Sequence, residues 1–91
     1  MAVSVEREFD ILNRLGLHAR AAAQLVRLAN GFASEIRVAK DAVEVNGKSI
    51  MGVLMLAAPM ESKILICATG PDAEEAVAAI GELIARKFGE E

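Results

Sequence analysis

The sequence contains few aromatic residues and has no excess of positive charge. Of its 91 residues, three are Phe and none is Trp or Tyr, and the formal net charge is −3. Proteins that bind single-stranded nucleic acid stack the bases on aromatic side chains, and contact with phosphate backbones requires a basic surface. We therefore expect no nucleic-acid partner.

Cysteine and histidine each occur once. Because Cys67 is the only cysteine, an internal disulfide and a zinc site made of several thiolates are excluded. With His18 as the only histidine, a metal site built from side chains would consist almost entirely of carboxylates, so we expect no metal and no cofactor. Cys67 lies among apolar neighbours, and we predict that it is a small buried residue without a chemical role.

Long hydrophobic runs are also missing. The longest apolar stretch, residues 51–60, contains Gly52 and Pro59 and is far shorter than the roughly 20 residues that cross a bilayer. The first residues do not combine a basic head with an apolar run, so the sequence predicts neither a secretory signal nor a membrane partner. We expect a cytoplasmic protein whose residues 1–91 form a single domain.

The spacing of apolar residues indicates four strands, three by alternation and one by a continuous apolar run. Residues 3–11 follow this period of two, with Arg7 as the one exception. Residues 34–40 and 43–45 form a predicted hairpin, in which Ile36 and Val38 face inward. Residues 63–69 are apolar at both odd and even positions, which is typical of a central strand.

Two helices are predicted in the first part of the chain. Residues 19–29 are rich in strong helix formers, and Asn30-Gly31 predicts a left-handed stop after them. Asn46-Gly47 indicates a turn, and Ser49 then occupies the N-cap position of a short helix over residues 50–56.

A third helix is predicted after Asp72, with apolar residues at helical intervals as far as Phe88. Asp72 and Glu75 have the spacing of a capping box, and Arg86 and Lys87 suit the negative end of the helix dipole. The predicted order is therefore β-α-β-β-α-β-α. It favours an α+β open-faced two-layer sandwich, with a four-stranded antiparallel sheet and three helices on one face.

Residues 16–20, Gly-Leu-His-Ala-Arg, form the one segment where a nucleophile, a cation and a helix start coincide. If His18 enters the helix, the free backbone N–H groups of the first turn form an anion site beside its ring. A neutral imidazole is a nucleophile, and the Arg20 guanidinium can hold phosphate oxygens in a bidentate manner. The segment predicts a transient phosphate acceptor, although an exposed helix cap and a solvated arginine would have the same spacing.

Four segments together resemble the HPr family, the histidine phosphocarriers of the phosphoenolpyruvate:sugar phosphotransferase system. They are residues 16–20, Asn30-Gly31-Phe32, Asn46-Gly47-Lys48-Ser49, and Ala68-Thr69-Gly70-Pro71-Asp72. The resemblance covers nearly the whole chain and implies an open-faced sandwich with the element order given above. Residues 50–56 and 68–71 are also similar to NPr, the carrier of the nitrogen-related branch.

The resemblance implies that His18 accepts a phosphoryl group at Nδ1 from enzyme I and passes it to a IIA-type acceptor. Arg20 matches the arginine that assists this transfer. Such a protein is turned over by two enzymes and is not a self-sufficient catalyst. An alternative is a regulatory module that acts mainly by docking to partners. Ala21 replaces the usual proline of the family, which should leave the helix intact and its first turn less rigid.

A second site of modification is implied at Ser49, which matches the serine phosphorylated in many HPr proteins by HPr kinase/phosphorylase. An N-cap role alone would also account for a serine at this position, so both interpretations stay open.

The resemblance further implies that Ile50, Met51 and Leu54 contact enzyme I. Ala19, Ala23 and Arg27 of the first helix complete the predicted partner surface. Residues 50–56 contain too many large apolar side chains for a single buried face, so part of this run should be exposed. We expect a monomer.

Overall fold

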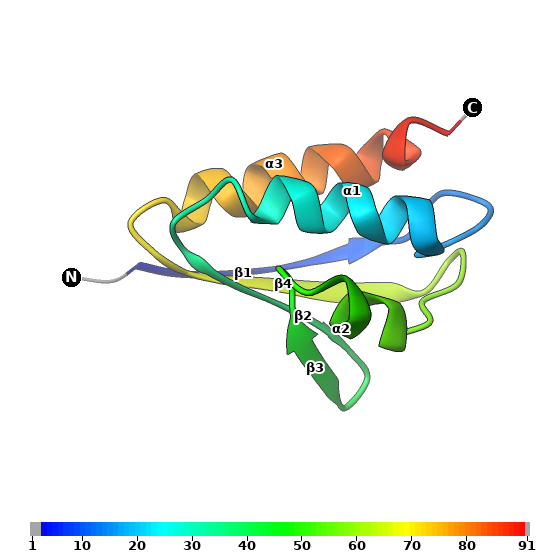
Figure 1. Cartoon of the computed structure of the whole chain (residues 1–91), viewed down its shortest axis with the longest axis horizontal. Coiled ribbons are helices and arrows are strands. Elements are labelled where there is room, and N and C mark those ends of the chain that lie inside the picture. Colours follow the sequence, from blue (N-terminus) through cyan, green and yellow to red (C-terminus); the bar gives the residue numbers. More distant parts are fainter. Residues whose placement is uncertain (1–2, 91) are drawn as a thin grey trace.

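The computed structural model describes residues 3–90. Its elements, in chain order, are β1 (Val3–Asp10), α1 (Ala19–Ala29), β2 (Glu35–Lys40), β3 (Val43–Asn46), α2 (Ile50–Met55), β4 (Lys63–Gly70), α3 (Ala73–Ala85) and the short 3₁₀ helix η1 (Lys87–Gly89). The strands form one antiparallel sheet in the order β1-β4-β2-β3, with α1 and α3 together above it (Figure 1). The predicted α+β open-faced sandwich is confirmed. Within residues 3–90, no helix is long and apolar enough to span a bilayer.

The core lies between the helices and one face of the sheet. The central strand β4 buries alternate residues there, Ile64, Ile66 and Ala68, as the period of two requires. Ile36 and Val38 of β2 are completely buried beside them, which confirms their predicted inward orientation. Burial of each of these isoleucine and valine side chains stabilises the fold by roughly 1.5–3 kcal/mol.

Close approach of α3 to β1 depends on Gly81. A Cβ atom at this position would lie only 2.5 Å from Cε1 of Phe9, so the ring of Phe9 occupies the space that a side chain would need. The absence of a side chain at Gly81 therefore lets the helix pack directly on the edge strand.

The end of α1 differs from the prediction. Asn30 has a right-handed backbone conformation with φ −69°, and Gly31 is not among the residues with positive φ. The helix instead ends in a tightened turn, in which the Gly31 N–H donates to the Leu28 carbonyl at 3.0 Å. The Asn30 side chain also donates to the Val26 carbonyl at 2.9 Å. These bonds satisfy the terminal carbonyls, so no left-handed residue is needed.

The end of α3 also differs, because the helix stops at Ala85 and does not reach Phe88. Lys87, Phe88 and Gly89 all have positive φ values, and Phe88 is buried in the core. Phe88 thus reaches the core from a reversed segment of the chain and not from a further turn of α3. Arg86 and Lys87 therefore lie beyond the last helical turn, contrary to the prediction.

Asp72 precedes α3 as predicted, but among the described residues its side chain makes no capping hydrogen bond to the helix. Its carboxylate accepts hydrogen bonds from the backbone N–H groups of Ala33 and Ser34, both at 2.9 Å, and from the Ser34 hydroxyl at 2.5 Å. The predicted capping box is wrong, because Asp72 joins the start of α3 to the start of β2. These bonds lower the pKa of Asp72 below its ordinary value, and the bond from the Ser34 hydroxyl contributes most.

We expect this carboxylate to make the stability of the protein dependent on acid pH. A lowered folded-state pKa means that Asp72 stabilises the fold above about pH 4 and that this stabilisation is lost as the pH falls through the folded pKa. Asp72→Asn should therefore unfold at lower urea concentration than the parent at neutral pH, and the difference should shrink below pH 4. Urea melts from pH 7 to pH 2 measure this, with the exposed Glu74→Gln as a charge-matched control. A difference that stays constant over this range would contradict the assignment.

Cys67 is partly exposed on the outer face of the sheet and is not buried as predicted. The helices cover only one face, so odd-numbered residues of β4 point to the uncovered side. The Cys67 thiol donates to the Glu6 carboxylate at 3.5 Å. Partial burial, followed by the contact with Glu6, raises the pKa of this thiol, which keeps it protonated and poorly nucleophilic.

Candidate functional site

The loop between β1 and α1 determines where His18 lies. Ile11 and Leu17 are buried and anchor the two ends of the loop in the core. Gly16 adopts φ +66°, and the Leu17 N–H donates to the Ala58 carbonyl at 2.9 Å. The loop is thus fixed against the segment that precedes β4, and the residue that follows Leu17 begins α1.

His18 is the N-cap residue of α1, with an extended backbone of φ −74° and ψ −179°. Its carbonyl accepts the first helical hydrogen bond, from Ala22 N–H at 2.8 Å. The side chain makes no capping bond within the described residues, so the imidazole is available for other contacts. Ala21 is buried in the first turn, and the helix begins normally without the proline that is usual in the family.

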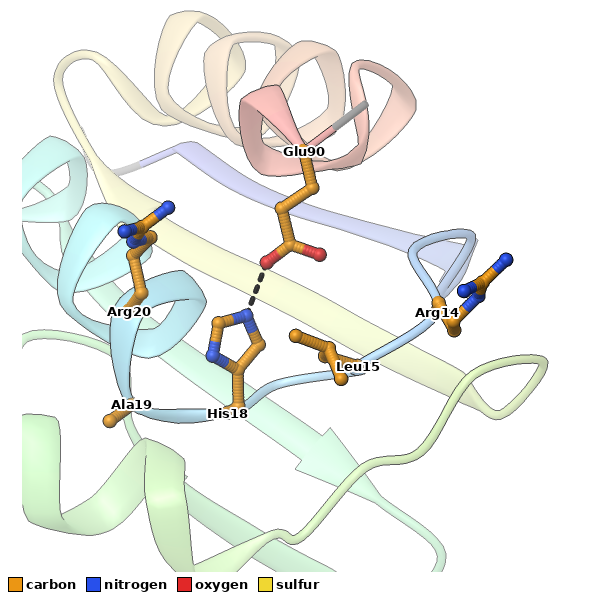
Figure 2. A pocket seen from close by; sticks show the side chains of 6 residues that line it. All are labelled: Arg14, Leu15, His18, Ala19, Arg20 and Glu90. Carbon is orange, nitrogen blue, oxygen red and sulfur yellow. Dashed lines mark hydrogen bonds and ion pairs between the residues drawn. The ribbon is translucent and has the colours of Figure 1, made fainter.

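The ring of His18 lies in a surface depression, where 29% of its side chain is exposed. The depression is lined by Arg14, Leu15, His18, Ala19, Arg20 and Glu90 (Figure 2). The structure therefore brings together three of the predicted site residues, His18, Arg20 and Ala19. Arg14, Leu15 and Glu90 also line the depression and were not predicted to belong to the site. Two guanidinium groups on its rim make it suited to an anion.

Glu90 contacts the histidine directly. Its Oε2 is hydrogen-bonded to Nε2 of His18, and its Oε1 accepts a hydrogen bond from Nδ2 of Asn13 at 3.1 Å. The bond from His18, with smaller contributions from Asn13 and from the charge of Arg20, lowers the pKa of the Glu90 carboxyl. Glu90 is therefore ionised at neutral pH. No local sequence pattern relates these groups, because Glu90 and His18 are 72 positions apart.

The second ring nitrogen, Nδ1, lies on the side of the imidazole turned away from Glu90 and toward the start of α1 (Figure 2). The N–H groups of a first helical turn have no partner inside the helix and carry the positive end of its dipole. A group bound to Nδ1 would therefore face backbone donors, with Arg20 on the same helix.

The remaining predicted partner residues lie on exposed parts of α1 and α2. Ile50 and Met51 are exposed, with 69% of Met51 accessible, whereas Leu54 is only half exposed. Val53 is completely buried, so the run is divided between core and surface as predicted. On α1, Ala19 and Arg27 are exposed and Ala23 is half-buried. Met55 is the most exposed large apolar residue of α2, with 74% accessible, and it was not among the predicted partner residues.

Ser49 is the N-cap of α2, as predicted. Its hydroxyl oxygen accepts a hydrogen bond from the Gly52 N–H at 3.2 Å, and its backbone is extended. The side chain is half-buried and stands next to the exposed residues Ile50 and Met51.

Comparison with known proteins identifies the family. A family model described as "PTS HPr component phosphorylation site" matches residues 5–86. The chain belongs to the HPr family. It is 46% identical to the phosphocarrier protein HPr of Cupriavidus necator, over 94% of this chain and 97% of the relative. It is 41% identical to the phosphocarrier protein NPr of Shewanella violacea, over 94% of both chains.

Solved structures of HPr proteins have the same fold. The crystal structure of HPr-C-His from Thermoanaerobacter tengcongensis has a TM-score of 0.92 and 46% identity, covering 96% of this chain and 98% of that one. As a member of the HPr family, the protein has the general role of a phosphocarrier in the phosphotransferase system. The family resemblance inferred from four short segments is confirmed over nearly the whole chain.

Proposed function

We propose that His18 carries the phosphoryl group, receiving it on Nδ1 from phospho-enzyme I and donating it to a IIA-type acceptor in the cytoplasm. The observation that supports this best is the position of His18 at the start of α1, where Nε2 is engaged by Glu90 and Nδ1 faces the first helical turn. The protein serves in turn as substrate and as donor, and it needs no cofactor for either step.

In the accepting step, the lone pair of Nδ1 attacks the phosphorus of the donor. A new N–P bond forms while the bond from phosphorus to the donor breaks, and its electron pair returns to the donor. The backbone N–H groups of the first turn and the Arg20 guanidinium hold the phosphoryl oxygens. An open depression with few donors suits this task, because a tighter cage would stabilise the bound phosphoryl group and slow its release.

Incubation of the purified protein with phosphoenolpyruvate and enzyme I tests the proposal. We expect a phosphoprotein that is labile in acid and stable in base, with the modification located at His18 by peptide mass spectrometry. Labelling at another residue would contradict the proposal, as would an absence of labelling with an enzyme I that phosphorylates another HPr.

Arg20 should contribute strongly to the rate. Loss of one positioned donor to a developing anion typically slows a reaction by about 10²- to 10³-fold, so we expect a decrease of this size in Arg20→Ala. Arg20→Lys should recover only part of the rate, since an ammonium group cannot bind phosphate in a bidentate manner. Initial rates with limiting enzyme I measure the effect. Arg7→Ala, which removes an exposed arginine from β1, is the control, and equal rates in the two alanine variants would contradict this role.

The type of IIA domain that accepts the phosphoryl group distinguishes two branches of the family. Relatives named HPr and NPr both match most of this chain, at 46% and 41% identity. Phosphoryl transfer from the labelled protein to a sugar-type and to a nitrogen-type IIA domain, measured side by side, distinguishes a sugar carrier from a signalling carrier. We expect the sugar-type domain to be the faster acceptor; a preference for the nitrogen-type domain would assign the protein to the regulatory branch.

We also propose that phosphorylation of Ser49 by an HPr kinase/phosphorylase regulates the carrier. Its hydroxyl lies at the start of α2, next to the exposed Ile50 and Met51 that we assign to the partner surface. A doubly charged phosphate there would repel an acidic partner. ATP and a lysate of the source cell should label the parent protein but not a folded Ser49→Ala variant. Equal labelling of both proteins would exclude Ser49 as the target.

A further inference from the structure

The last described residues make an unusual reversal after α3. Lys87, Phe88 and Gly89 have successive φ values of +57°, +56° and +77°. Left-handed conformations are unfavourable for residues other than glycine, so two in a row require compensation from elsewhere in the structure. Burial of Phe88 provides this compensation, because only 1% of its surface is exposed and its ring is part of the core. Glu90 follows this reversal and lies opposite His18 at the start of α1 (Figure 2).

Asn13 holds Glu90 in a defined orientation. Its side chain is 1% exposed, and its Nδ2 donates both to the Gly16 carbonyl at 2.8 Å and to Oε1 of Glu90 at 3.1 Å. The Gly16 carbonyl and the Glu90 carboxylate are both acceptors, so the side-chain amide of Asn13 must turn its nitrogen, not its oxygen, toward them. The buried Oδ1 of Asn13 has no hydrogen-bond partner among residues 3–90. A buried polar atom without a partner is unfavourable, which indicates that the two donated bonds determine the orientation.

The bond between Glu90 and His18 defines the position of a proton. An ionised carboxylate has no proton to donate, so Nε2 of His18 must be the donor. When the ring is neutral it then has a single proton, on Nε2, and the lone pair is on Nδ1.

We propose that Glu90 is a positioning residue for His18: held by Asn13, it keeps the proton on Nε2 and thereby leaves the Nδ1 lone pair free to accept the phosphoryl group. This rests on the proposed function of His18. After transfer, Nε2 keeps its proton and the phosphorylated ring is positively charged. The Glu90 carboxylate next to Nε2 then stabilises that charge without occupying the side on which the phosphoryl group is bound.

The tautomer of His18 tests the proposal without any partner protein. Long-range ¹H–¹⁵N spectra of the unphosphorylated protein at alkaline pH distinguish a proton on Nε2 from one on Nδ1. We expect the Nε2–H form in the parent protein and a mixture of both forms in Glu90→Ala. Glu82→Ala is the matched control, because it removes an exposed carboxylate of α3 and changes the net charge equally. Glu90 is half-buried and lies outside the helices and strands, so Glu90→Ala should fold, which circular dichroism verifies.

Chemical phosphorylation gives a second partner-free measurement. With phosphoramidate as the phosphoryl donor, ³¹P NMR should show modification at Nδ1 in the parent and in Glu82→Ala. Glu90→Ala should gain a fraction modified at Nε2, the nitrogen that Glu90 otherwise covers. With enzyme I, phosphorylation of Glu90→Ala should be slower by about 10- to 100-fold, as is typical when a group that fixes a histidine tautomer is removed.

The outcomes separate this proposal from the function on which it rests. A mixture of tautomers in the parent protein, or the same tautomer and the same rate in Glu90→Ala and Glu82→Ala, would overturn the positioning role and leave His18 as the phosphoryl carrier. If enzyme I labels the protein elsewhere than at His18, the proposed function fails, while the spectra still report whether Glu90 fixes the ring.

Discussion

His18→Ala should reduce phosphorylation by enzyme I to the background level, by at least about 10³-fold, because catalysis through a covalent intermediate requires its nucleophile. The protein has one histidine, so no second imidazole can replace it. Initial rates of phosphate incorporation from phosphoenolpyruvate measure the loss. The same variant should be inactive as a donor to either type of IIA domain.

The loss should not result from unfolding. Among the described residues, the His18 side chain does not cap α1, and it is hydrogen-bonded to Glu90. Helix formation depends instead on the backbone of residue 18, whose carbonyl accepts from Ala22 N–H. We therefore expect His18→Ala to melt within a few degrees of the parent. Incorporation of acid-labile phosphate into this folded variant would exclude His18 as the carrier.

Gly16→Ala should be among the most destabilising single substitutions in the loop that carries His18. A Cβ atom at Gly16 would collide with the carbonyl oxygen of Ala58 and lie 2.9 Å from Cα of Pro59, both of which are backbone atoms. The left-handed conformation of residue 16 adds about 1–2 kcal/mol for a residue with a side chain. Overpacking typically costs a further 1–3 kcal/mol, so we expect a loss of roughly 2–5 kcal/mol in the free energy of unfolding.

Gly89→Ala separates the cost of the left-handed backbone conformation from the cost of overpacking. Gly89 also has positive φ, at +77°, but a Cβ atom there would have no neighbour within 4 Å. Gly89→Ala should therefore lose only the conformational part, about 1–2 kcal/mol. Urea denaturation of both variants provides the comparison. Equal stabilities would show that the segment of Ala58 and Pro59 moves away to accommodate a side chain. Since the clash displaces the loop before His18, Gly16→Ala should also slow phosphoryl acceptance.

The sequence by itself determined the features that depend on neighbours along the chain. Alternation placed Ile36 and Val38 on the inner face of the sheet, and a serine before an apolar run placed Ser49 at the start of α2. His18 and Arg20 were predicted together at the start of α1 because a helix start and the two side chains fall within a few residues. Strand periodicity and helix starts follow from local spacing, so they can be read from a single chain.

Tertiary structure decided where the helices end and which groups surround His18. Asp72 has the spacing of a helix cap, but Ala33 and Ser34 offered three donors that only the packed sheet brings into reach. The helical pattern up to Phe88 was equally misleading, because the helix stops at Ala85 and Phe88 is buried from a segment with positive φ values.

The contact of Glu90 with His18 depends on this reversal of the chain. No period or motif connects two residues 72 positions apart, and they meet just after the segment 87–89 reverses the chain. The sequence alone thus predicted His18 and Arg20 as site residues, since both belong to one helix start. The contact of Glu90, which we propose to orient His18, depends on how residues 87–90 pack against the loop before α1.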